Sequence, residues 1–160
     1  MEKVLVVLAF IVMISACGGG ENKEEKNSNP YSTAEKKSEG NPDYDPNRGV
    51  GKWTAENIGV SDALDVAKAE SGEKIAEVKC SSCHKMTEER LVGPGWKGVT
   101  TRRKGEWIMN FISNPDPMIE KDPVVQAQLE LCLVRMPNQN LSDSEARDVY
   151  ELMRKNDGVK

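Results

Sequence analysis

The sequence has few aromatic residues, a single histidine and no long hydrophobic run. Aromatic residues make up 5% of the 160 positions and charged residues 30%, so the apolar core is thin for this length and a buried apolar cofactor would add to it. The formal net charge of −4 argues against general nucleic-acid binding. The apolar run from Val4 to Ile14 has eleven residues, and it is too short to span a bilayer because a spanning helix needs about 20.

The apolar run near the N-terminus has the features of an export signal instead. Lys3 supplies a short positive region before it, and residues 14–17 (Ile-Ser-Ala-Cys) resemble the cleavage box of bacterial lipoproteins. The resemblance implies that 1–16 is a signal peptide and that the sulfur of Cys17 carries diacylglycerol. Two or more acyl chains would anchor the chain stably to a bacterial membrane. The rest would then face the periplasm or the outer surface. An uncleaved anchor, or an ordinary signal peptide with a chance cysteine, is the alternative.

The next segment, 17–48, is predicted to be a lipid-anchored flexible tether. It is rich in Glu, Lys, Asn and Ser and has almost no aliphatic residues, so it cannot bury enough apolar surface to offset its ordering entropy. Either a leash that lets a folded domain sample partners or a plain spacer fits this composition. The folded domain is expected over 49–160, and Trp53 is expected to pack on it as a core anchor within a non-helical segment.

The run Cys80-Ser81-Ser82-Cys83-His84 is the most informative motif in the chain. A C-x-x-C-H pattern is typical of covalent c-type haem attachment. Two thiols three residues apart lie on one face of a helical turn, so both can reach the vinyl groups of one porphyrin. The following imidazole becomes the proximal iron ligand. Because His84 is the only histidine, bis-histidine ligation is excluded by composition.

The same residues allow two other chemistries. A zinc site made by His84 and the three cysteines Cys80, Cys83 and Cys132 has suitable ligand types, but Cys83 and His84 are adjacent, which makes tetrahedral closure awkward. A dithiol redox motif would leave the histidine unexplained. Both alternatives are therefore weaker than haem attachment.

A sixth ligand for the iron must come from a methionine. The methionines after the motif are Met86, Met109, Met118, Met136 and Met153. Met86 is too close to His84 to reach the opposite haem face, and two others fall on predicted helices. Met118 and Met136 both lie in predicted loops and both remain candidates. The loop with Met136 precedes a capped helix and can fold back over the distal face.

The spacing of apolar residues predicts an all-α domain of four to five helices, without a convincing strand pattern. The expected helices span about 61–79, 105–113, 122–133 and 142–157. The first is expected to be interrupted at Ser71-Gly72, and Gly72 is expected to mark a close helix crossing because it has no side chain. Prolines 115 and 117 are expected to end the second helix. Asp122 and Ser142 are the expected N-caps of the last two.

The order of these features resembles class I cytochromes c over roughly 61–157. The resemblance is carried by Gly72, the haem motif, Gly93-Pro94, Met136-Pro137 and Leu141-Ser142-Asp143 before a terminal helix. It implies an all-α fold around one covalent haem c. It also implies that Met136 is the distal iron ligand and that the carbonyl of Pro94 accepts a hydrogen bond from Nδ1 of His84.

The resemblance implies an electron carrier and not an enzyme. Iron with both axial positions filled has no open site for a substrate. We expect a monomer that passes single electrons between respiratory redox proteins by transient docking, with no small-molecule substrate. The whole sequence also resembles small cytochrome c lipoproteins of Bacteroidetes-type bacteria, some of which are associated with anaerobic reductases such as nitrous-oxide reductase. The alternative is a haem peroxidase or gas-binding sensor with a labile sixth ligand.

Three further features have more than one interpretation. The apolar neighbours of Cys132 favour a buried, inert thiol without an intramolecular disulfide, although an intermolecular one fits an oxidising compartment. Residues 102–104 (Arg-Arg-Lys) are either a solvated basic turn or a partner for haem propionates or an acidic protein. Asn138 or Asn140 is a candidate hydrogen-bond donor near the sulfur of Met136.

Overall fold

A computed structural model of the chain describes residues 44–160, and within them it contains helices and no strand. The all-α prediction is therefore confirmed. The helices are α2 (Val66–Lys79), α3 (Val99–Arg102), α4 (Gly105–Ser113), α5 (Pro115–Lys121), α6 (Pro123–Cys132) and α7 (Asp143–Asn156). The predicted signal peptide, Cys17 and the tether up to residue 43 lie outside the described residues. No helix of the described part is long and apolar enough to cross a membrane.

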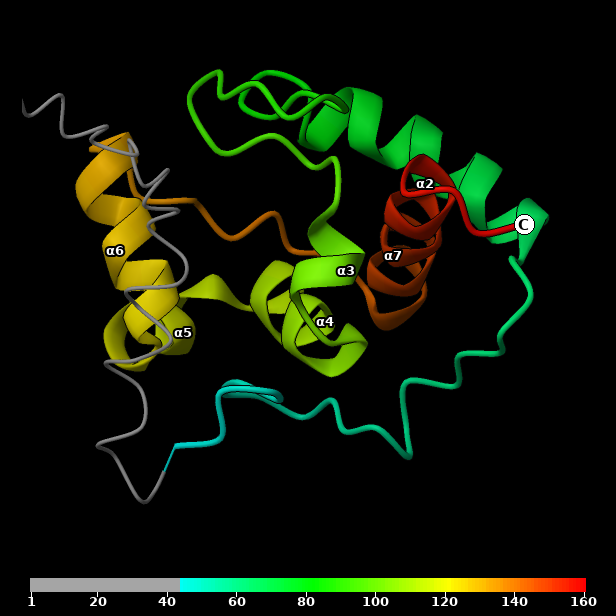
Figure 1. Cartoon of the computed structure of the whole chain (residues 1–160), viewed down its shortest axis with the longest axis horizontal. Coiled ribbons are helices and arrows are strands. Elements are labelled where there is room, and N and C mark those ends of the chain that lie inside the picture. The colour runs from blue at the N-terminus through cyan, green and yellow to red at the C-terminus, as the bar shows by residue number, and fades with distance from the viewer. Residues whose placement is uncertain (1–43) are drawn as a thin grey trace, which may run out of the picture.

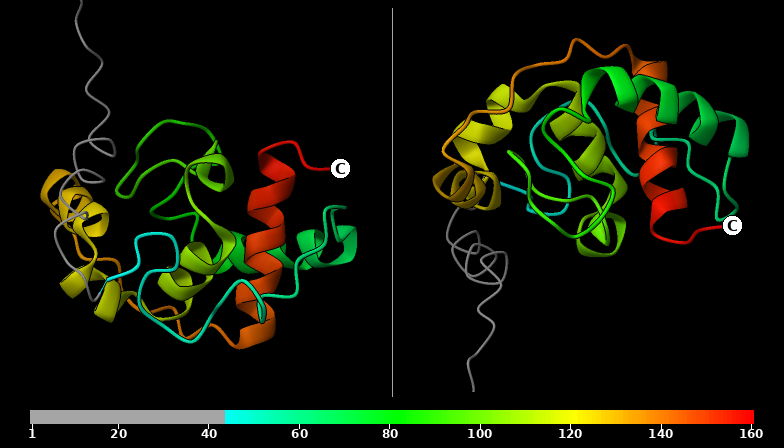
Figure 2. Two further views of the ribbon diagram at one scale, coloured as in Figure 1. Left: turned by 60° about the horizontal axis from the view of Figure 1, so that its bottom comes forward. Right: turned by 90° about the horizontal axis from the view of Figure 1, so that it is seen from above.

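The crossing of α2 and α7 organises one end of the domain (Figures 1 and 2). The buried residues of α2 are Ala69, Gly72 and Ala76, which form a stripe of small residues facing α7. A Cβ on Gly72 would collide with the backbone carbonyl oxygen of Asp148, so the two backbones touch there. The predicted close crossing at Gly72 is confirmed.

The predicted interruption of the first helix is wrong. α2 runs without a break from Val66 through Ser71 and Gly72 to Lys79. A glycine in a helix interior costs about 1 kcal/mol relative to alanine. Packing against α7 offsets that cost, because only glycine allows the close approach.

A non-helical strap, residues 44–64, crosses the domain and is fastened by side-chain hydrogen bonds. The backbone N–H of Trp53 donates to Asn110 Oδ1 at 2.8 Å, and its indole Nε1 donates to Ser113 Oγ at 3.0 Å. Asn110 Nδ2 in turn donates to the carbonyl oxygens of Arg48 and Trp53. Trp53 packs against the buried core, as its prediction as a core anchor requires.

The strap begins earlier than the composition suggested. Residues 44–48 belong to the predicted tether, but Tyr44 is buried and its hydroxyl donates to a carboxylate oxygen of Asp122. The pKa of Tyr44 is raised, chiefly by burial and then by this hydrogen bond. A hydrogen-bond partner 78 residues away in the sequence leaves no trace in local composition.

Asp122 joins the strap, α4 and α6. Its carboxylate also accepts from Trp107 Nε1 at 2.6 Å and from the backbone N–H groups of Val124 and Val125 at 2.7 and 3.0 Å. It is therefore the N-cap of α6, as predicted, and a buried acceptor for two aromatic side chains. A buried charge is tolerated when it is fully hydrogen-bonded, and four donors supply that here.

The segment around Met118 is helical, contrary to the prediction of a loop. Pro115 occupies the first turn of α5, where proline lacks only an N–H that has no partner inside the helix. Met118 is fully buried, and its sulfur accepts from the backbone N–H of Val50 at 2.8 Å. Met118 is thus a core residue.

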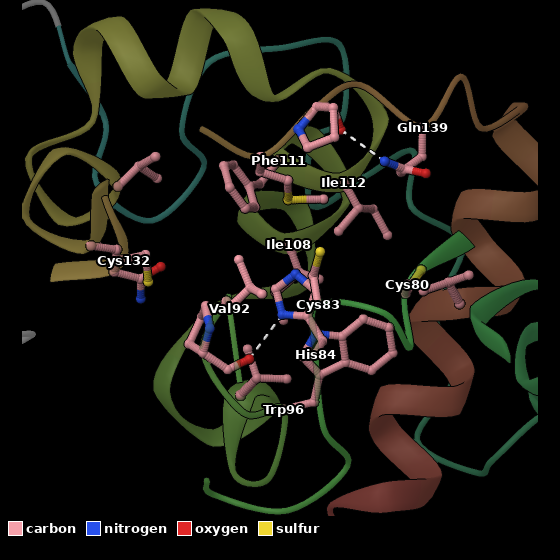
Figure 3. A pocket seen from close by; sticks show the side chains of 18 of the residues that line it. Cys80, Cys83, His84, Val92, Trp96, Ile108, Phe111, Ile112, Cys132 and Gln139 are labelled. Carbon is pink, nitrogen blue, oxygen red and sulfur yellow. Dashed lines mark hydrogen bonds between the residues drawn. The ribbon is translucent and has the colours of Figure 1, made fainter. Parts of the chain in front are cut away.

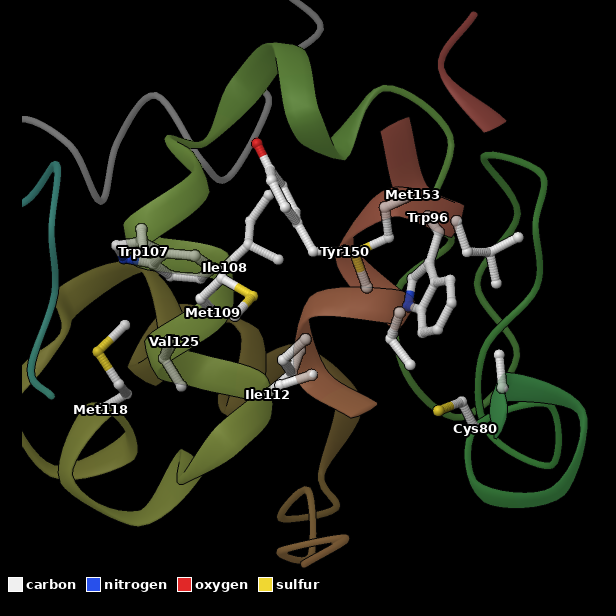
Figure 4. Packing of buried hydrophobic residues seen from close by; sticks show 14 of the residues in the cluster. Cys80, Trp96, Trp107, Ile108, Met109, Ile112, Met118, Val125, Tyr150 and Met153 are labelled. Carbon is white, nitrogen blue, oxygen red and sulfur yellow. The ribbon is translucent and has the colours of Figure 1, made fainter. Parts of the chain in front are cut away.

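The core lies between these two ends of the domain (Figure 4). Ile108 and Ile112 of α4 occupy its middle. Trp107, Met109 and Met118 pack toward α5 and α6, whereas Tyr150 and Met153 of α7 pack on the other side together with Trp96 and Cys80. α4 therefore connects the α2–α7 crossing to the α5–α6 end.

Replacing Gly72 by alanine tests the crossing. We expect Gly72→Ala to lower the free energy of unfolding by about 1–3 kcal/mol, because the added methyl group separates the two helices. Chemical denaturation measures this. Lys74→Ala, an exposed position of the same helix, is the matched control and is expected to be nearly neutral. An equal effect of both substitutions would mean that the crossing tolerates a side chain.

Candidate haem site

The attachment motif forms a tight turn where α2 ends. Cys80 is the C-cap of α2, and its carbonyl oxygen accepts from the backbone N–H groups of Cys83 and His84, both at 3.0 Å. Cys80 is buried, whereas Cys83 and His84 are half-buried. All three line one pocket. The turn therefore presents two thiols and one imidazole to the same space.

The imidazole of His84 is held in one orientation by Pro94. Nδ1 lies 2.8 Å from the carbonyl oxygen of Pro94. A carbonyl can only accept, so Nδ1 carries the proton and Nε2 keeps its lone pair. Burial lowers the pKa of His84, partly opposed by the hydrogen bond to Pro94. The neutral ring with a free Nε2 is the form that binds a metal.

The loop after the motif wraps around His84 through backbone hydrogen bonds. Gly93 N donates to the Cys83 carbonyl at 2.8 Å, and Trp96 N donates to the Lys85 carbonyl at 2.9 Å. A Cβ on Gly93 would collide with the His84 ring. The Trp96 ring lies 5.6 Å from the His84 ring, centroid to centroid. Glycine at position 93 thus lets the loop approach the imidazole closely enough for Pro94 to bind it.

The pocket has a volume of about 300 Å³ and a predominantly apolar wall. Figure 3 shows Ile108, Phe111 and Ile112 of α4 across the pocket from the His84 ring, with Cys132 of α6 farther along the wall. Two thiols and an imidazole with a free Nε2, facing an apolar wall, fit a covalently attached haem. Within residues 44–160, no three His, Cys, Asp or Glu side chains come together as a metal-ion site, which contradicts the zinc alternative.

Met136 lies on the wall of this pocket, in the segment after α6. It is half-buried and lines the pocket together with Pro137, whereas Met118 does not line it. Arg135 holds the segment by an ion pair with Asp116 at 2.8 Å. Of the two methionines that the sequence left as candidates, only Met136 shares the pocket with His84.

The polar residue that sequence reasoning missed is Gln139. Asn138 and Asn140 are both exposed, and Asn138 Oδ1 accepts from the backbone N–H of Asn140. Gln139 is half-buried, lines the pocket and donates from Nε2 to the Pro137 carbonyl at 3.2 Å. The expectation of an asparagine beside the Met136 sulfur does not fit. A glutamine at this spacing gave no signal because side-chain direction in an irregular segment does not follow a fixed period.

The basic cluster is part of the pocket and not a solvated turn. Arg102 and Arg103 are half-buried and line the pocket. The Arg103 guanidinium lies 5.3 Å from the Trp107 ring centroid, and Arg102 Nη1 donates to the Lys97 carbonyl at 2.9 Å. Of the three residues of the cluster, only Lys104 is exposed.

The surroundings of Cys132 differ from the prediction. Cys132 is half-buried on the pocket wall, but its neighbours Leu131, Leu133 and Val134 are exposed. α6 ends at Cys132, so the apolar residues around it turn outward instead of continuing a buried stripe.

Comparisons with known proteins agree with this site. The family model for cytochrome c matches residues 69–157. Cytochrome c from Rhodothermus marinus is 30% identical, with a TM-score of 0.63, and the match covers 71% of this chain and 97% of that chain. An engineered form, Rma TDE, is 28% identical with a TM-score of 0.61, and the same form bound to a carbene intermediate is 29% identical with a TM-score of 0.59. Each of these two matches covers 80% of this chain and 97% of the engineered chain. No curated protein matches the sequence significantly.

The chain therefore belongs to the cytochrome c family. It is a class I mono-haem member, and its cofactor is an iron-containing haem c bound covalently to the protein. Cys80 and Cys83 supply the thiols of the attachment motif.

Gly93→Ala tests how closely the loop must approach the imidazole. The added Cβ would push the His84 ring away from Pro94, so we expect less haem-loaded protein and a shifted reduction potential in what does load. Absorption spectroscopy and potentiometry measure both. Glu88→Ala, an exposed position of the same loop that does not line the pocket, is the matched control. An unchanged potential in Gly93→Ala would show that the contact with Pro94 does not tune the site.

Proposed function

We propose that this protein is a mono-haem electron carrier whose iron is ligated by His84 and Met136. The observation that carries the proposal is that the Nε2 side of a pre-oriented His84 and the half-buried Met136 line the same apolar pocket. When bound, the haem supplies a one-electron couple between ferrous and ferric iron. Methionine ligation favours a higher reduction potential than a second histidine would.

The chain's own residues have separate tasks in this proposal. Pro94 fixes the orientation of His84, and Gly93 makes room for it. The apolar side chains of α4, among them Ile108 and Ile112, exclude water from the pocket. Arg102 and Arg103, whose side chains line the pocket, would pair with the haem propionates, because guanidinium groups bind carboxylates well.

The place of the carrier in the cell is also part of the proposal. The lipoprotein-like residues 14–17 favour attachment of the chain to a bacterial membrane through Cys17, with the haem domain in the periplasm or at the outer surface. The protein would act as a monomer between respiratory redox partners. The resemblance to Bacteroidetes-type cytochrome c lipoproteins favours an anaerobic reductase, such as nitrous-oxide reductase, as electron acceptor.

Replacing the two candidate methionines separately tests the ligand assignment. We expect the wild-type protein to show sharp reduced bands and the weak near-infrared methionine–iron band, and not to bind carbon monoxide. Met136→Ala should lose that band and bind carbon monoxide, because an axial position opens. Met118→Ala, a buried core position, should lose about 2–5 kcal/mol of stability but keep the wild-type spectrum.

Two outcomes would contradict this proposal. A near-infrared methionine–iron band that persists in Met136→Ala would remove Met136 as ligand. Carbon monoxide binding by the wild-type protein would mean a labile sixth position and would favour a peroxidase or gas sensor. The engineered Rhodothermus marinus form bound to a carbene intermediate is an example of a structurally similar protein that holds a reactive ligand.

The lipid anchor has its own test. Labelled palmitate should be incorporated into the wild-type chain when it is expressed in a bacterium. Cys17→Ser should abolish the labelling, because Cys17 is the cysteine of the lipoprotein-like residues 14–17. Cys132→Ser is the matched control and should be labelled like the wild type. Labelling that persists in Cys17→Ser would rule out this anchor.

A further inference from the structure

The described part of the chain has two buried carboxylates, and only one of them is paired with cations. Glu151 binds Arg147 at 2.6 Å and Arg154 at 2.7 Å. Asp122 is 1% exposed and takes part in none of the ion pairs of the described residues. Neutral hydrogen-bond donors alone stabilise its charge. Because the interior has a low dielectric, such a charge acts more strongly on its surroundings than an exposed one.

The arrangement of the donors favours the ionised form of Asp122. Its Oδ1 accepts from the backbone N–H groups of Val124 and Val125, and its Oδ2 accepts from Trp107 Nε1. The hydroxyl of Tyr44 also donates to Oδ2. Three of the four donors are N–H groups, which cannot accept a proton from a carboxylic acid. Hydrogen bonds to the charged form of a carboxyl group favour that form.

This carboxylate lies directly behind the wall of the haem pocket. Asp122 does not itself line the pocket, but Trp107 and Val125 do, and each of them donates a hydrogen bond to one of its oxygens. Trp107 belongs to α4 and Val125 to α6, so the charge lies where these two helices meet the pocket. At both places a single residue separates the charge from the space for the haem.

The cation on this part of the wall is Arg103. Its guanidinium lies 5.3 Å from the centroid of the Trp107 ring, and the residue lines the pocket. In the proposed function Arg103 pairs with a haem propionate, because guanidinium groups bind carboxylates well. The charge of Arg103 is then balanced within the pocket, whereas the charge of Asp122 behind the wall is not.

We propose that Asp122 lowers the reduction potential of the haem by placing a buried negative charge behind Trp107 and Val125. This rests on the proposed electron-transfer function. Loss of one electron by the iron adds one positive charge, and a nearby negative charge stabilises the more positive, ferric state. Asp122 acts through the two wall residues and is therefore a positioning residue, not an iron ligand. Its carboxylate offsets part of the rise in potential that methionine ligation favours.

Potentiometry of the haem-loaded full chain tests the role of the charge. Asp122→Asn removes the charge and keeps the shape of the side chain and a good N-cap. We expect the ratio of ferrous to ferric protein at a fixed ambient potential to rise about tenfold, which is an upward shift of about 59 mV for a one-electron couple. Asp122→Ser is a second neutral N-cap, and it should shift the potential in the same direction.

Two matched variants separate the buried charge from other effects. Glu120→Gln removes the same charge two residues earlier, at an exposed position of α5, and should change the ratio less than about twofold because solvent screens that charge. Tyr44→Phe removes one hydrogen bond to Asp122 but keeps the carboxylate charged. The ferrous fraction should not rise in this variant, although the strap is loosened as in Asp122→Asn.

The possible results distinguish this proposal from the assignment of function. Wild-type potentials in both neutral variants of Asp122, with a normal methionine-ligated spectrum, would overturn the tuning role and leave the electron carrier intact. An equal rise in Glu120→Gln would assign the effect to net charge, and an equal rise in Tyr44→Phe would assign it to loosening of the strap; either result overturns the proposal. Loss of the methionine–iron band in both Asp122 variants would make the residue structural. A wild-type spectrum without methionine ligation would overturn the function first.

Discussion

The contact of the Gly72 backbone with the Asp148 carbonyl is the constraint on which the rest of the domain depends. It fixes how closely α2 and α7 cross, and α2 ends directly at Cys80. The position of the first haem-attachment thiol is therefore set by a helix crossing two turns away. α7 also contributes Val149 and Met153 to the pocket wall, so the same crossing positions the proximal motif and part of the apolar lining.

A second constraint acts at the opposite end, where Asp122 accepts four hydrogen bonds in a buried position. One carboxylate caps α6 and binds the indole of Trp107 and the hydroxyl of Tyr44. The start of α6 is thereby fixed to α4 and to the strap. At its other end, beside Cys132, the side chains of Leu131 and Leu133 are exposed.

The sequence predicted most of what local chemistry determines. The haem motif, the N-caps at Asp122 and Ser142 and the glycine at the crossing are each visible in a few adjacent residues. It did not predict what depends on distant partners. Glu151 is fully buried because Arg147 and Arg154 pair with it, and those arginines also bind carbonyl oxygens of the strap. Packing of this kind has no local signal.

The difference between local and distant interactions also explains which parts of the site the sequence could predict. The proximal side was predicted well because His84, Gly93 and Pro94 are close in sequence and are joined by short-range hydrogen bonds. The part of the pocket wall that contains Met136 is an irregular segment, and its contacts with α5 are exposed, such as the ion pair between Arg135 and Asp116. Exposed ion pairs contribute little stability. The loop around His84 is held by backbone hydrogen bonds, whereas the segment with Met136 is held to α5 by exposed side-chain contacts. Local opening of the pocket is therefore expected to begin at the segment with Met136.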